Sequence, residues 1–586
     1  MYVLGISCFY HDSSASLVKD GKVIAASQEE RFTRKKHDIS FPINSIKYCL
    51  EEAKININQI DYIAYYEKPM QKFERVLHQV IEKFPFSFYM FYKAMPSWIS
   101  EKLRIRKIIK KKLGYTKDIL FIEHHMCHAA SSYLTSPFKE AAILTIDGVG
   151  EWDTTTLGYA KDNKIIISKR LIFPHSVGLL YSTVTAFLGF SVNNSEYKVM
   201  GLSPYGRRDK SNPYYHKFKK IINIKEDGSF EMDMDYFCYH YKVYMPSKKF
   251  IGEFGPARKK ESGITQRHKD IAAGLQMITE EIILKMLNHL HKETNIPNLC
   301  LAGGVGLNSV ANGKILKNTP FKDVFIQPDA GDGGTSMGAA LYAYYSLLNP
   351  KTERKDFMKT AYLGPKYSTM EIKEFLDKNK IKYSIYEYEK ELIKDVVDLL
   401  LDDNVIGWFQ GRMEWGPRAL GARSILSNPT NPEMQEILNL KVKHREKFRP
   451  FAPVVCEDDA KKYFECDLPI PRPTDFMLMV YPIKKQYHKE IPAVTHVDGS
   501  GRLQTIRKED NPLYYSLIKE FGKYSGTPIL INTSFNIRGE PIVMSPYHAY
   551  RCMMGTGIDY LIIDKFLIKR SDNPKDIWDS EKYAKD

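Results

Sequence analysis

AILTIDGVGEWDTTTLGYAKDNKIIISKRL, residues 142–171, is the stretch that decides the fold. Its three apolar runs are separated by a glycine-rich turn and by an Asp-Asn turn, a pattern that predicts three successive antiparallel strands. Residues 2–30 repeat this order as YVLGIS, SASLVKD and KVIAASQEE. Two such meanders, each followed by helices, predict a duplicated α/β fold whose lobes hold a ligand between their strand-end loops. The alternative is two unrelated hairpins.

A histidine pair lies just before this stretch, in HHMCH at residues 124–128. His124 and His128 are four apart, so on a helix they project from one face and can hold one metal ion. Asp147 ends the first strand of the stretch, and Asp332 follows another apolar strand and precedes a helix. We predict a metal site built from these four side chains. His125 would point about a hundred degrees away on the helix, which favours His124 as the ligand.

Glycine-rich turns follow two further predicted strands, in LAGGVGLNSVANGKI at residues 301–315 and DAGDGGTSMGAA at residues 329–340. Backbone N–H groups at such turns bind phosphate because they point outward and the helix dipole favours an anion. Together the two turns predict that the metal lies among glycines able to admit the phosphates of a nucleotide. The chain is therefore expected to be an enzyme.

Length and composition indicate a globular protein of two or more domains, because 586 residues are too many for one core. No run of about twenty uncharged apolar residues is present, so no membrane span is expected, and we expect no membrane partner. The first residues, MYVLGISCFYHDSS, lack a signal-peptide pattern. Eight cysteines without a CxxC pair argue against disulfides and thiolate zinc sites, and they favour a cytoplasmic location.

The net charge of +15 is mostly dispersed lysine, with local density at residues 104–112 and 258–260. This pattern favours solvated faces over a nucleic-acid groove, so nucleic acid is not an expected partner. Anionic small substrates would explain part of the charge. Residues 68–114 form an aromatic and basic insertion that caps an acceptor site, contacts a partner or packs as core. Residues 208–262 form a second insertion without a clear period.

A second domain is predicted from about residue 351, where the composition shifts to a Lys/Glu-rich helix. In QGRMEWGPRALGARS, residues 410–424, three arginines recur every five or six residues among glycines, which excludes a helical stripe. Arginine forks on such a turn suit bidentate capture of phosphate or carboxylate. More polar groups follow in KHR at 443–445 and in NTSFNIRGE at 532–540. An oxyanion pocket is favoured over surface salt bridging.

The order of these motifs resembles the O-carbamoyltransferases of nodulation-factor and antibiotic biosynthesis over essentially the full chain. The matching strings are HDSSASLVKDG, EERFTRKKH, HHMCHAASSY, TIDGVGEWDTT, SEYKVMGLSPYG, LAGGVGLNSVANGKI, GDGGTSMGAA, GRMEWGPRALGARSIL, FRPFAP and NTSFNIRGEPIV. The resemblance implies an actin/Hsp70-like (ribonuclease-H-like) module over residues 1–350. It implies a second α/β module, similar to threonylcarbamoyl-adenylate synthase, over residues 351–586.

The resemblance also implies a reaction in two steps. Carbamoyl phosphate and ATP, the latter accompanied by Mg²⁺, would give carbamoyl-adenylate in the second module. The first module would then transfer the carbamoyl group to a hydroxyl of a sugar or another small molecule. The metal is Fe²⁺ by resemblance, and two imidazoles with two carboxylates also suit Mn²⁺ or Zn²⁺. A homodimer is compatible with the resemblance.

Each module receives its own set of implied site residues. The metal ligands are His124, His128, Asp147 and Asp332. The nucleotide in the transfer module is assigned to Gly148, Gly303, Gly304, Asn308 and Asp332. His11 is the candidate to orient or deprotonate the acceptor hydroxyl, beside Asp12. Carbamoyl phosphate and ATP in the second module are assigned to Arg412, Arg418, Arg423, Lys443, Arg445, Arg449, Arg507, Ser534, Asn536 and Arg538.

Three rival functions stay open. A tRNA-modifying threonylcarbamoyl transferase would account for the basic charge. A metallopeptidase is suggested by HHMCH, but His125 occupies the place where HExxH needs its glutamate. A nucleotide-dependent scaffold of the actin-like type is the non-catalytic alternative.

Overall fold

The computed structural model describes residues 1–354 and 356–573. Its contacts divide the chain into two compact units. The N-terminal unit comprises residues 1–29 and 37–358. The C-terminal unit comprises residues 30–36 and the chain from residue 359. Within the described ranges, none of the helices combines the length and the apolar character needed to cross a membrane.

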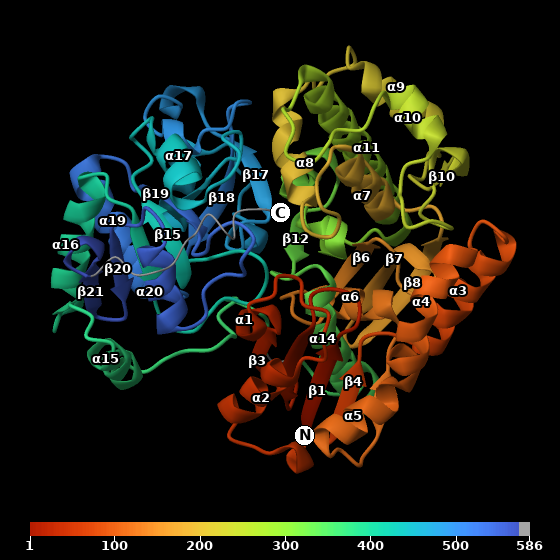
Figure 1. Cartoon of the computed structure of the whole chain (residues 1–586), viewed down its shortest axis with the longest axis horizontal. Coiled ribbons are helices and arrows are strands. Elements are labelled where there is room, and N and C mark those ends of the chain that lie inside the picture. Colours follow the sequence, from red (N-terminus) through yellow and green to blue (C-terminus); the bar gives the residue numbers. More distant parts are fainter. Residues whose placement is uncertain (355, 574–586) are drawn as a thin grey trace. The chain divides into compact units, whose positions relative to one another are not determined.

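The N-terminal unit contains two five-stranded sheets with the same strand order (Figure 1). The first sheet has the order β3-β2-β1-β4-β5 and the second β8-β7-β6-β11-β12, read from the corresponding edge. In each, the first three strands form an antiparallel meander and the fourth and fifth join parallel to the first. The strands are β1 (Tyr2–Ser7), β2 (Ser14–Lys19), β3 (Lys22–Gln28), β4 (Tyr62–Tyr65), β5 (Ile119–Phe121), β6 (Glu140–Ile146), β7 (Asp153–Lys161), β8 (Lys164–Ile172), β11 (Asn298–Ala302) and β12 (Asp323–Ile326).

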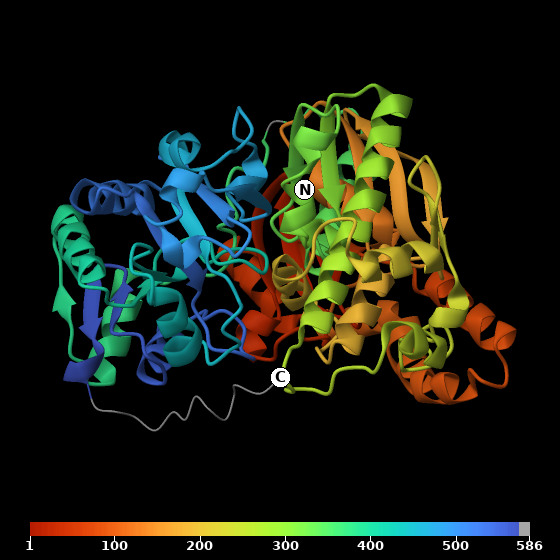
Figure 2. The same ribbon diagram turned by 90° about the horizontal axis from the view of Figure 1, so that it is seen from above.

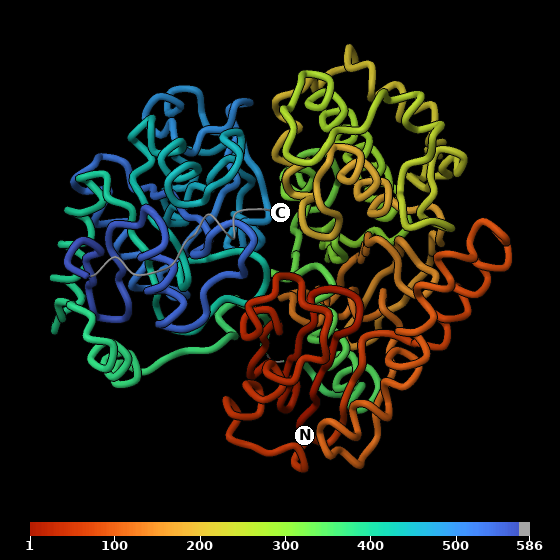
Figure 3. Tube along the Cα trace, viewed as in Figure 1, coloured from red at the N-terminus to blue at the C-terminus, as the bar shows by residue number. Residues whose placement is uncertain are grey.

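This repeated order confirms the predicted duplication and is that of the actin/Hsp70-like fold. The helix that follows each fifth strand packs on the opposite sheet. Helix α6 (His124–Tyr133) follows β5 and contacts β6 and β11, whereas α14 (Asp332–Tyr342) follows β12 and contacts β1 and β2. The two helices also pack on each other. In the tube of Figure 3, the red N-terminal strands and green α14 therefore lie together although they are far apart in sequence.

Two glycines permit this close packing. A Cβ added to Gly338 in α14 would lie 1.9 Å from the carbonyl oxygen of Cys127 in α6. A Cβ on Gly5 in β1 would lie 1.8 Å from the carbonyl oxygen of Ser336 in α14. Any larger residue would push α14 away from the helix or from the sheet.

Both insertions fold as helical additions to the N-terminal unit. Residues 68–114 form α3 (Pro69–Glu82), α4 (Phe88–Ser100) and α5 (Ile105–Leu113) between β4 and β5. Figure 2 shows these helices at one end of the unit. Residues 208–262 contain α9 (Pro213–Ile221), β9 (Ile222–Ile224), β10 (Phe230–Met232) and α10 (Lys248–Phe254). The other helices of the unit are α2 (Ile43–Glu52), α7 (Val177–Phe187), α8 (Glu196–Leu202), α11 (Gln266–Thr294), α12 (Ser309–Asn312) and α13 (Ile315–Asn318).

The C-terminal unit is built on a nine-stranded mixed sheet of order β13-β21-β20-β14-β15-β19-β16-β18-β17. Helices α16 and α19 pack on it through an apolar core that includes Val397, Trp408 and Phe521. The strands are β13 (Ser384–Ile385), β14 (Ile406–Phe409), β15 (Arg423–Ser427), β16 (Ala452–Cys456), β17 (Met479–Pro482), β18 (Ser500–Ile506), β19 (Ile529–Ser534), β20 (Tyr560–Ile563) and β21 (Phe566–Lys569). The helices are α1 (Glu30–Thr33), α15 (Thr369–Lys378), α16 (Glu389–Leu401), α17 (Met434–Ile437), α18 (Glu457–Tyr463), α19 (Pro512–Ser525) and α20 (Pro546–Met554).

The short segment 30–36 belongs to the C-terminal unit although it follows β3 in sequence, which the sequence did not predict. The guanidinium of Arg31 donates to the carbonyl oxygen of Gly416 at 2.8 Å. Arg34 donates to the carbonyl oxygens of Pro541 at 2.6 Å and Ile542 at 2.7 Å. Two arginines thus join this N-terminal segment to loops of the second unit.

Candidate metal centre and anion site

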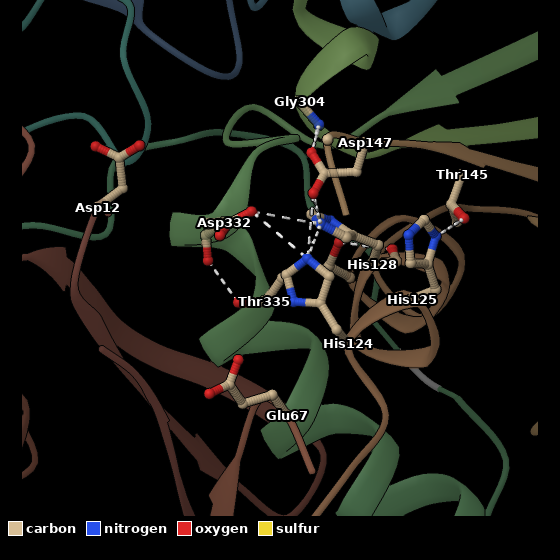
Figure 4. A network of polar contacts seen from close by, with 12 residues as sticks. Asp12, Glu67, His124, His125, His128, Thr145, Asp147, Gly304, Asp332 and Thr335 are labelled. Atoms are coloured by element: carbon tan, nitrogen blue, oxygen red, sulfur yellow. Dashed lines mark hydrogen bonds and ion pairs between the residues drawn. The ribbon is translucent and has the colours of Figure 1, made fainter. Parts of the chain in front are cut away.

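The four predicted metal ligands come together in the N-terminal unit (Figure 4). His124 begins α6 and His128 follows one turn later, so both rings point from the same face. Asp147 is the residue after β6, and Asp332 is the first residue of α14. One ligand atom from each of the four residues lies within 4.8 Å of all the others, and all four residues are buried. The duplicated fold therefore delivers two imidazoles and two carboxylates to one point.

The distances describe a compact cluster. The Nε2 atoms of His124 and His128 are 3.1 Å apart, and the His124 Nε2 lies 3.3 Å from an oxygen of Asp147. Asp332 Oδ1 lies 3.6 Å from the His124 Nε2 and 3.7 Å from the His128 Nε2. Two nitrogens and two oxygens thus face one small space, as the first ligands of a divalent cation would.

The Asp332 carboxylate shows why a cation fits this space. Both of its oxygens are fully enclosed, and no donor among the described residues reaches them at hydrogen-bond distance. An enclosed carboxylate that accepts no hydrogen bond costs free energy, and a bound cation would remove that cost. For Asp147, burial raises the pKa, but the hydrogen bond to His124 and the nearby His128 outweigh burial and hold the pKa well below its usual range. The chemistry and burial of the donor set fit a divalent metal.

The surroundings of the cluster hold its members in place. One oxygen of Asp147 accepts a hydrogen bond from the Gly304 N–H at 2.8 Å. The backbone N–H of His124 donates to Glu151. His125 points away from the cluster, with its Nδ1 2.6 Å from the Thr145 hydroxyl (Figure 4), as the helical spacing predicted. The Nδ1 atoms of His124 and His128 are enclosed without a hydrogen-bond partner among the described residues, so packing and the contacts of the Nε2 atoms orient these two rings.

His11 and Asp12 lie beside the cluster. The His11 Nε2 is 3.6 Å from Asp332, and its Nδ1 is 2.9 Å from Asp12. The second oxygen of Asp12 lies 2.7 Å from the His37 Nδ1. Burial lowers the pKa of His11, but Asp332 and Asp12 outweigh it and raise the pKa to about 10. His11 is therefore a proton donor at neutral pH when Asp332 carries its charge.

The predicted nucleotide residues divide into two groups. Gly303 and Gly304 lie against the end of β6, where a Cβ on Gly303 would meet the Ile146 carbonyl oxygen at 2.1 Å. The Gly148 carbonyl accepts a hydrogen bond from the Ser176 hydroxyl at 2.7 Å. The amide of Asn308 is bonded to Gln276 and caps α12, so structural partners already occupy it. The predicted role of all these residues toward a nucleotide is untested.

Insertion helix α3 adds buried cations that the sequence did not single out. The Lys72 ammonium lies 2.5 Å from Glu67 and 4.9 Å from the ring centroid of Tyr10. Arg75, one turn further along α3, is only 6% exposed. Its guanidinium makes no hydrogen bond or ion pair with any residue of the described chain, and only the Phe173 ring, at 5.0 Å, packs on it. The i, i+3 spacing of the two cations was the available signal.

In the C-terminal unit, the predicted lysine, serine and asparagine come together. The buried Lys443 ammonium donates to the Ser534 carbonyl, to the Ser534 hydroxyl at 3.3 Å and to the Asn536 side-chain oxygen at 3.0 Å. The Ser534 hydroxyl donates to the same Asn536 oxygen at 2.7 Å. Burial, with Arg445 and Arg449 nearby, lowers the pKa of Lys443 well below its usual range. Of these three side chains, only Lys443 carries a charge, and none is negative.

An arginine cluster accompanies that lysine, and it contains one member that the sequence did not single out. Burial lowers the pKa of Arg502 well below its usual range, and the positive charges of Arg418 and Arg449 lower it further. The Arg502 guanidinium has no hydrogen bond or ion pair within residues 1–354 and 356–573. Arg449 and Arg538 flank Glu446 at 3.7 and 3.8 Å. Guanidinium groups gathered in this way, with Glu446 between two of them, are able to bind phosphate.

The other predicted arginines have partners inside the protein. Arg423 is completely buried, and its two terminal nitrogens donate to the carbonyl oxygens of Gln410, Ala422, Pro365 and Gly411. Arg412 donates to the carbonyl oxygens of Leu363 and Gly364. Arg507 pairs with Asp475 at 3.0 Å and with Glu457. The geometry gives these three side chains structural partners, and their predicted role toward phosphates is untested.

Comparison with known proteins matches two family models to the chain. The family model for the carbamoyltransferase N-terminus matches residues 2–341, and the model for the carbamoyltransferase C-terminus matches residues 397–570. The chain is 37% identical to nodulation protein NolNO of Sinorhizobium fredii, covering 97% of this chain and 80% of that protein. It is 35% identical to nodulation protein NolO of Bradyrhizobium diazoefficiens, covering 77% of this chain and 79% of that protein.

Among solved structures, that of T. kodakarensis HypF matches 59% of this chain and 48% of that chain, with 11% identity and a TM-score of 0.31. The family models together span most of the chain, one on each side of the division between the units. The protein therefore belongs to the carbamoyltransferase family.

Proposed function

We propose that this protein is an ATP-dependent O-carbamoyltransferase that uses carbamoyl phosphate as donor and a hydroxyl-bearing small molecule as acceptor. The observation that carries the proposal is the buried cluster of His124, His128, Asp147 and Asp332, in which both oxygens of Asp332 are enclosed without a hydrogen bond from the described residues. These four residues would hold a divalent ion. When bound, that ion would supply Lewis-acid polarisation of the carbamoyl carbonyl.

The C-terminal unit forms the activated intermediate in this proposal. Water cleaves carbamoyl phosphate to carbamate and phosphate, and the carbamate oxygen then attacks the α-phosphorus of ATP. The products of that attack are carbamoyl-adenylate and pyrophosphate. The unpaired guanidinium of Arg502, with Arg418 and Arg449, neutralises the phosphates, and Lys443 lies between Ser534 and Asn536 to bind the small carbamoyl group.

The N-terminal unit transfers the carbamoyl group. The acceptor hydroxyl attacks the carbamoyl carbon, its proton leaves to solvent, and the C–O bond to AMP breaks. His11, whose Nε2 lies 3.6 Å from Asp332, is the candidate to orient or deprotonate the acceptor hydroxyl. Gly303 and Gly304 admit the nucleotide close to the end of β6.

The experiment measures pyrophosphate release from ATP by the purified full chain. We expect release with carbamoyl phosphate and none with threonine plus bicarbonate. Release with threonine plus bicarbonate but not with carbamoyl phosphate would support the tRNA-modifying alternative and exclude our proposal. Mass spectrometry of reactions that contain metabolite extracts then identifies the acceptor by a mass gain of one carbamoyl group.

A pair of histidine variants separates the two steps. His128→Ala removes a proposed ligand, so bound metal and carbamoyl transfer should be lost while pyrophosphate release continues. His125→Gln is the matched control on the same helix, because the His125 Nδ1 is held by Thr145 and His125 is not one of the four ligands. It should keep its metal, measured by elemental analysis. Parental transfer by His128→Ala would refute the metal role.

A further inference from the structure

A cluster of large apolar side chains lies exposed where α3 meets α4. We name residues 81–92 the aromatic tip. Six of its side chains are between 58% and 76% exposed: Ile81, Phe84, Phe86, Phe88, Tyr89 and Tyr92. Figure 1 shows this turn projecting from the N-terminal unit beside the α3 label. Single exposed apolar residues are common on proteins, but a contiguous group of this kind marks a surface that something covers.

Helix α4 continues the apolar surface beyond the tip. Its inward face packs through the buried Trp98 and the half-buried Phe91. Its outward face nevertheless presents Phe88, Tyr92 and Ile99 to solvent. A surface helix normally has a polar outward face, whereas one that is apolar on all sides lies in an apolar surrounding. The outward face of α4 thus needs a second apolar surface.

The charge of the segment from the aromatic tip to α5 indicates the chemistry of the surface that covers α4. Residues 81–117 contain ten Lys or Arg residues and two acidic residues, Glu82 and Glu101. Arg106, Lys107 and Lys111 on α5 are exposed. At the tip, the Lys93 ammonium lies 4.7 Å from the Tyr89 ring centroid. Exposed aromatic residues interleaved with many basic ones match the interface of an anionic lipid bilayer, where rings enter the headgroup region and cations meet the acidic lipids.

We propose that the aromatic tip, α4 and α5 form a docking surface for an anionic membrane. With 13 residues, α4 is roughly 20 Å long, so it lies in the plane of the interface and does not span the bilayer. A symmetric contact with a second copy would bring two strongly basic segments together, which like-charge repulsion opposes. This surface departs from the sequence-based expectation of no membrane partner. It is independent of the proposed enzymatic function.

The test is cosedimentation of the full chain with sucrose-loaded vesicles. We expect binding to vesicles of phosphatidylcholine and phosphatidylglycerol at 3:1, weaker binding at high salt, and little binding to phosphatidylcholine alone. Phe86→Ser/Phe88→Ser/Tyr92→Ser should abolish the binding. Each of Lys107→Gln and Lys111→Gln should weaken it about fivefold, the factor that corresponds to ~1 kcal/mol per basic residue.

The matched control is Met370→Ser/Ile385→Ser/Tyr388→Ser, which changes three exposed apolar residues of the C-terminal unit. It should bind vesicles like the parent. Circular dichroism and thermal unfolding check that every variant is folded. Equal vesicle binding by the tip variant and the parent would overturn the proposal, as would no binding by the parent. A dimer, seen by light scattering and lost in the tip variant without any vesicle binding, would assign the face to self-association and also overturn the proposal.

Discussion

Replacing Gly338 by alanine tests whether the close fit of α6 against α14 builds the metal cluster. The added Cβ would lie 1.9 Å from the Cys127 carbonyl oxygen, whereas real Cβ contacts below 3.0 Å are essentially unknown. The two helices must therefore separate by at least about 1.1 Å at this point, because a packed interior has no room to absorb the atom otherwise. The variant is thus a steric wedge against the backbone of Cys127, which precedes His128, and it leaves all four ligand side chains unchanged.

The wedge should act on the cluster because the ligands are divided between the helices. Helix α6 carries both histidines, and α14 begins at Asp332, 3.6 and 3.7 Å from their Nε2 atoms. A misplacement of about 1 Å costs roughly 100-fold in rate when it reaches reacting groups. Overpacking of this kind costs about 1–3 kcal/mol of stability. We expect substoichiometric metal, transfer reduced about 100-fold and a lower Tm, with pyrophosphate release retained.

Elemental analysis, thermal unfolding and the two activity assays measure these effects. Gly252→Ala is the matched control, because nothing lies within 4 Å of a Cβ at that helical position in α10. It should keep its metal and gain about 0.5–1 kcal/mol, since alanine is favoured over glycine inside a helix. Stoichiometric metal and a parental Tm in Gly338→Ala would refute the claim that the added Cβ separates α6 from α14.

Three further predictions address charged groups. Arg418→Ala should abolish pyrophosphate release while transfer from added carbamoyl-adenylate persists; unchanged release would remove the arginine cluster from the activation step. Arg75→Met should raise the Tm, because it replaces a buried guanidinium without a partner among the described residues, and a lower Tm would show a hidden structural role. The charge of His11 stabilises the metal-free protein below about pH 6.5, and this contribution is lost as the pH rises toward its folded pKa of about 10. The Tm advantage of the parent over His11→Asn should therefore shrink between these values, and a constant difference would contradict the charged state.

Much of the N-terminal unit could be predicted from local patterns. Both meanders form where the alternation of apolar runs and turns placed them, and the duplication is confirmed by the identical strand orders. The histidine pair could be predicted because an i, i+4 spacing on a helix is a local property. The aromatic insertion was noticed, but its exposure could not be predicted, because an apolar helix reads the same whether it is buried or covered by another molecule.

The arginines show where sequence reasoning stops. Arg423 and Arg502 both stand beside glycine turns, and only Arg423 was predicted as an anion ligand. In the structure the Arg423 guanidinium donates to backbone carbonyls. The Arg502 guanidinium has no partner among the described residues and lies near two other guanidinium groups. Burial and the positions of neighbouring carbonyls decide between these roles, and neither is encoded in spacing along the chain.

The sequence by itself determined the strands, the turns, the helical histidine pair and the family, because these depend on neighbouring residues or on the order of motifs. Only the tertiary structure decided that Asp147 and Asp332 meet the histidines, since each aspartate ends a strand-to-turn segment in a different part of the second sheet. It also decided that residues 30–36 join the C-terminal unit through Arg31 and Arg34. The physical reason is that long-range contacts depend on how sheets and helices pack, and that packing is a property of the whole unit.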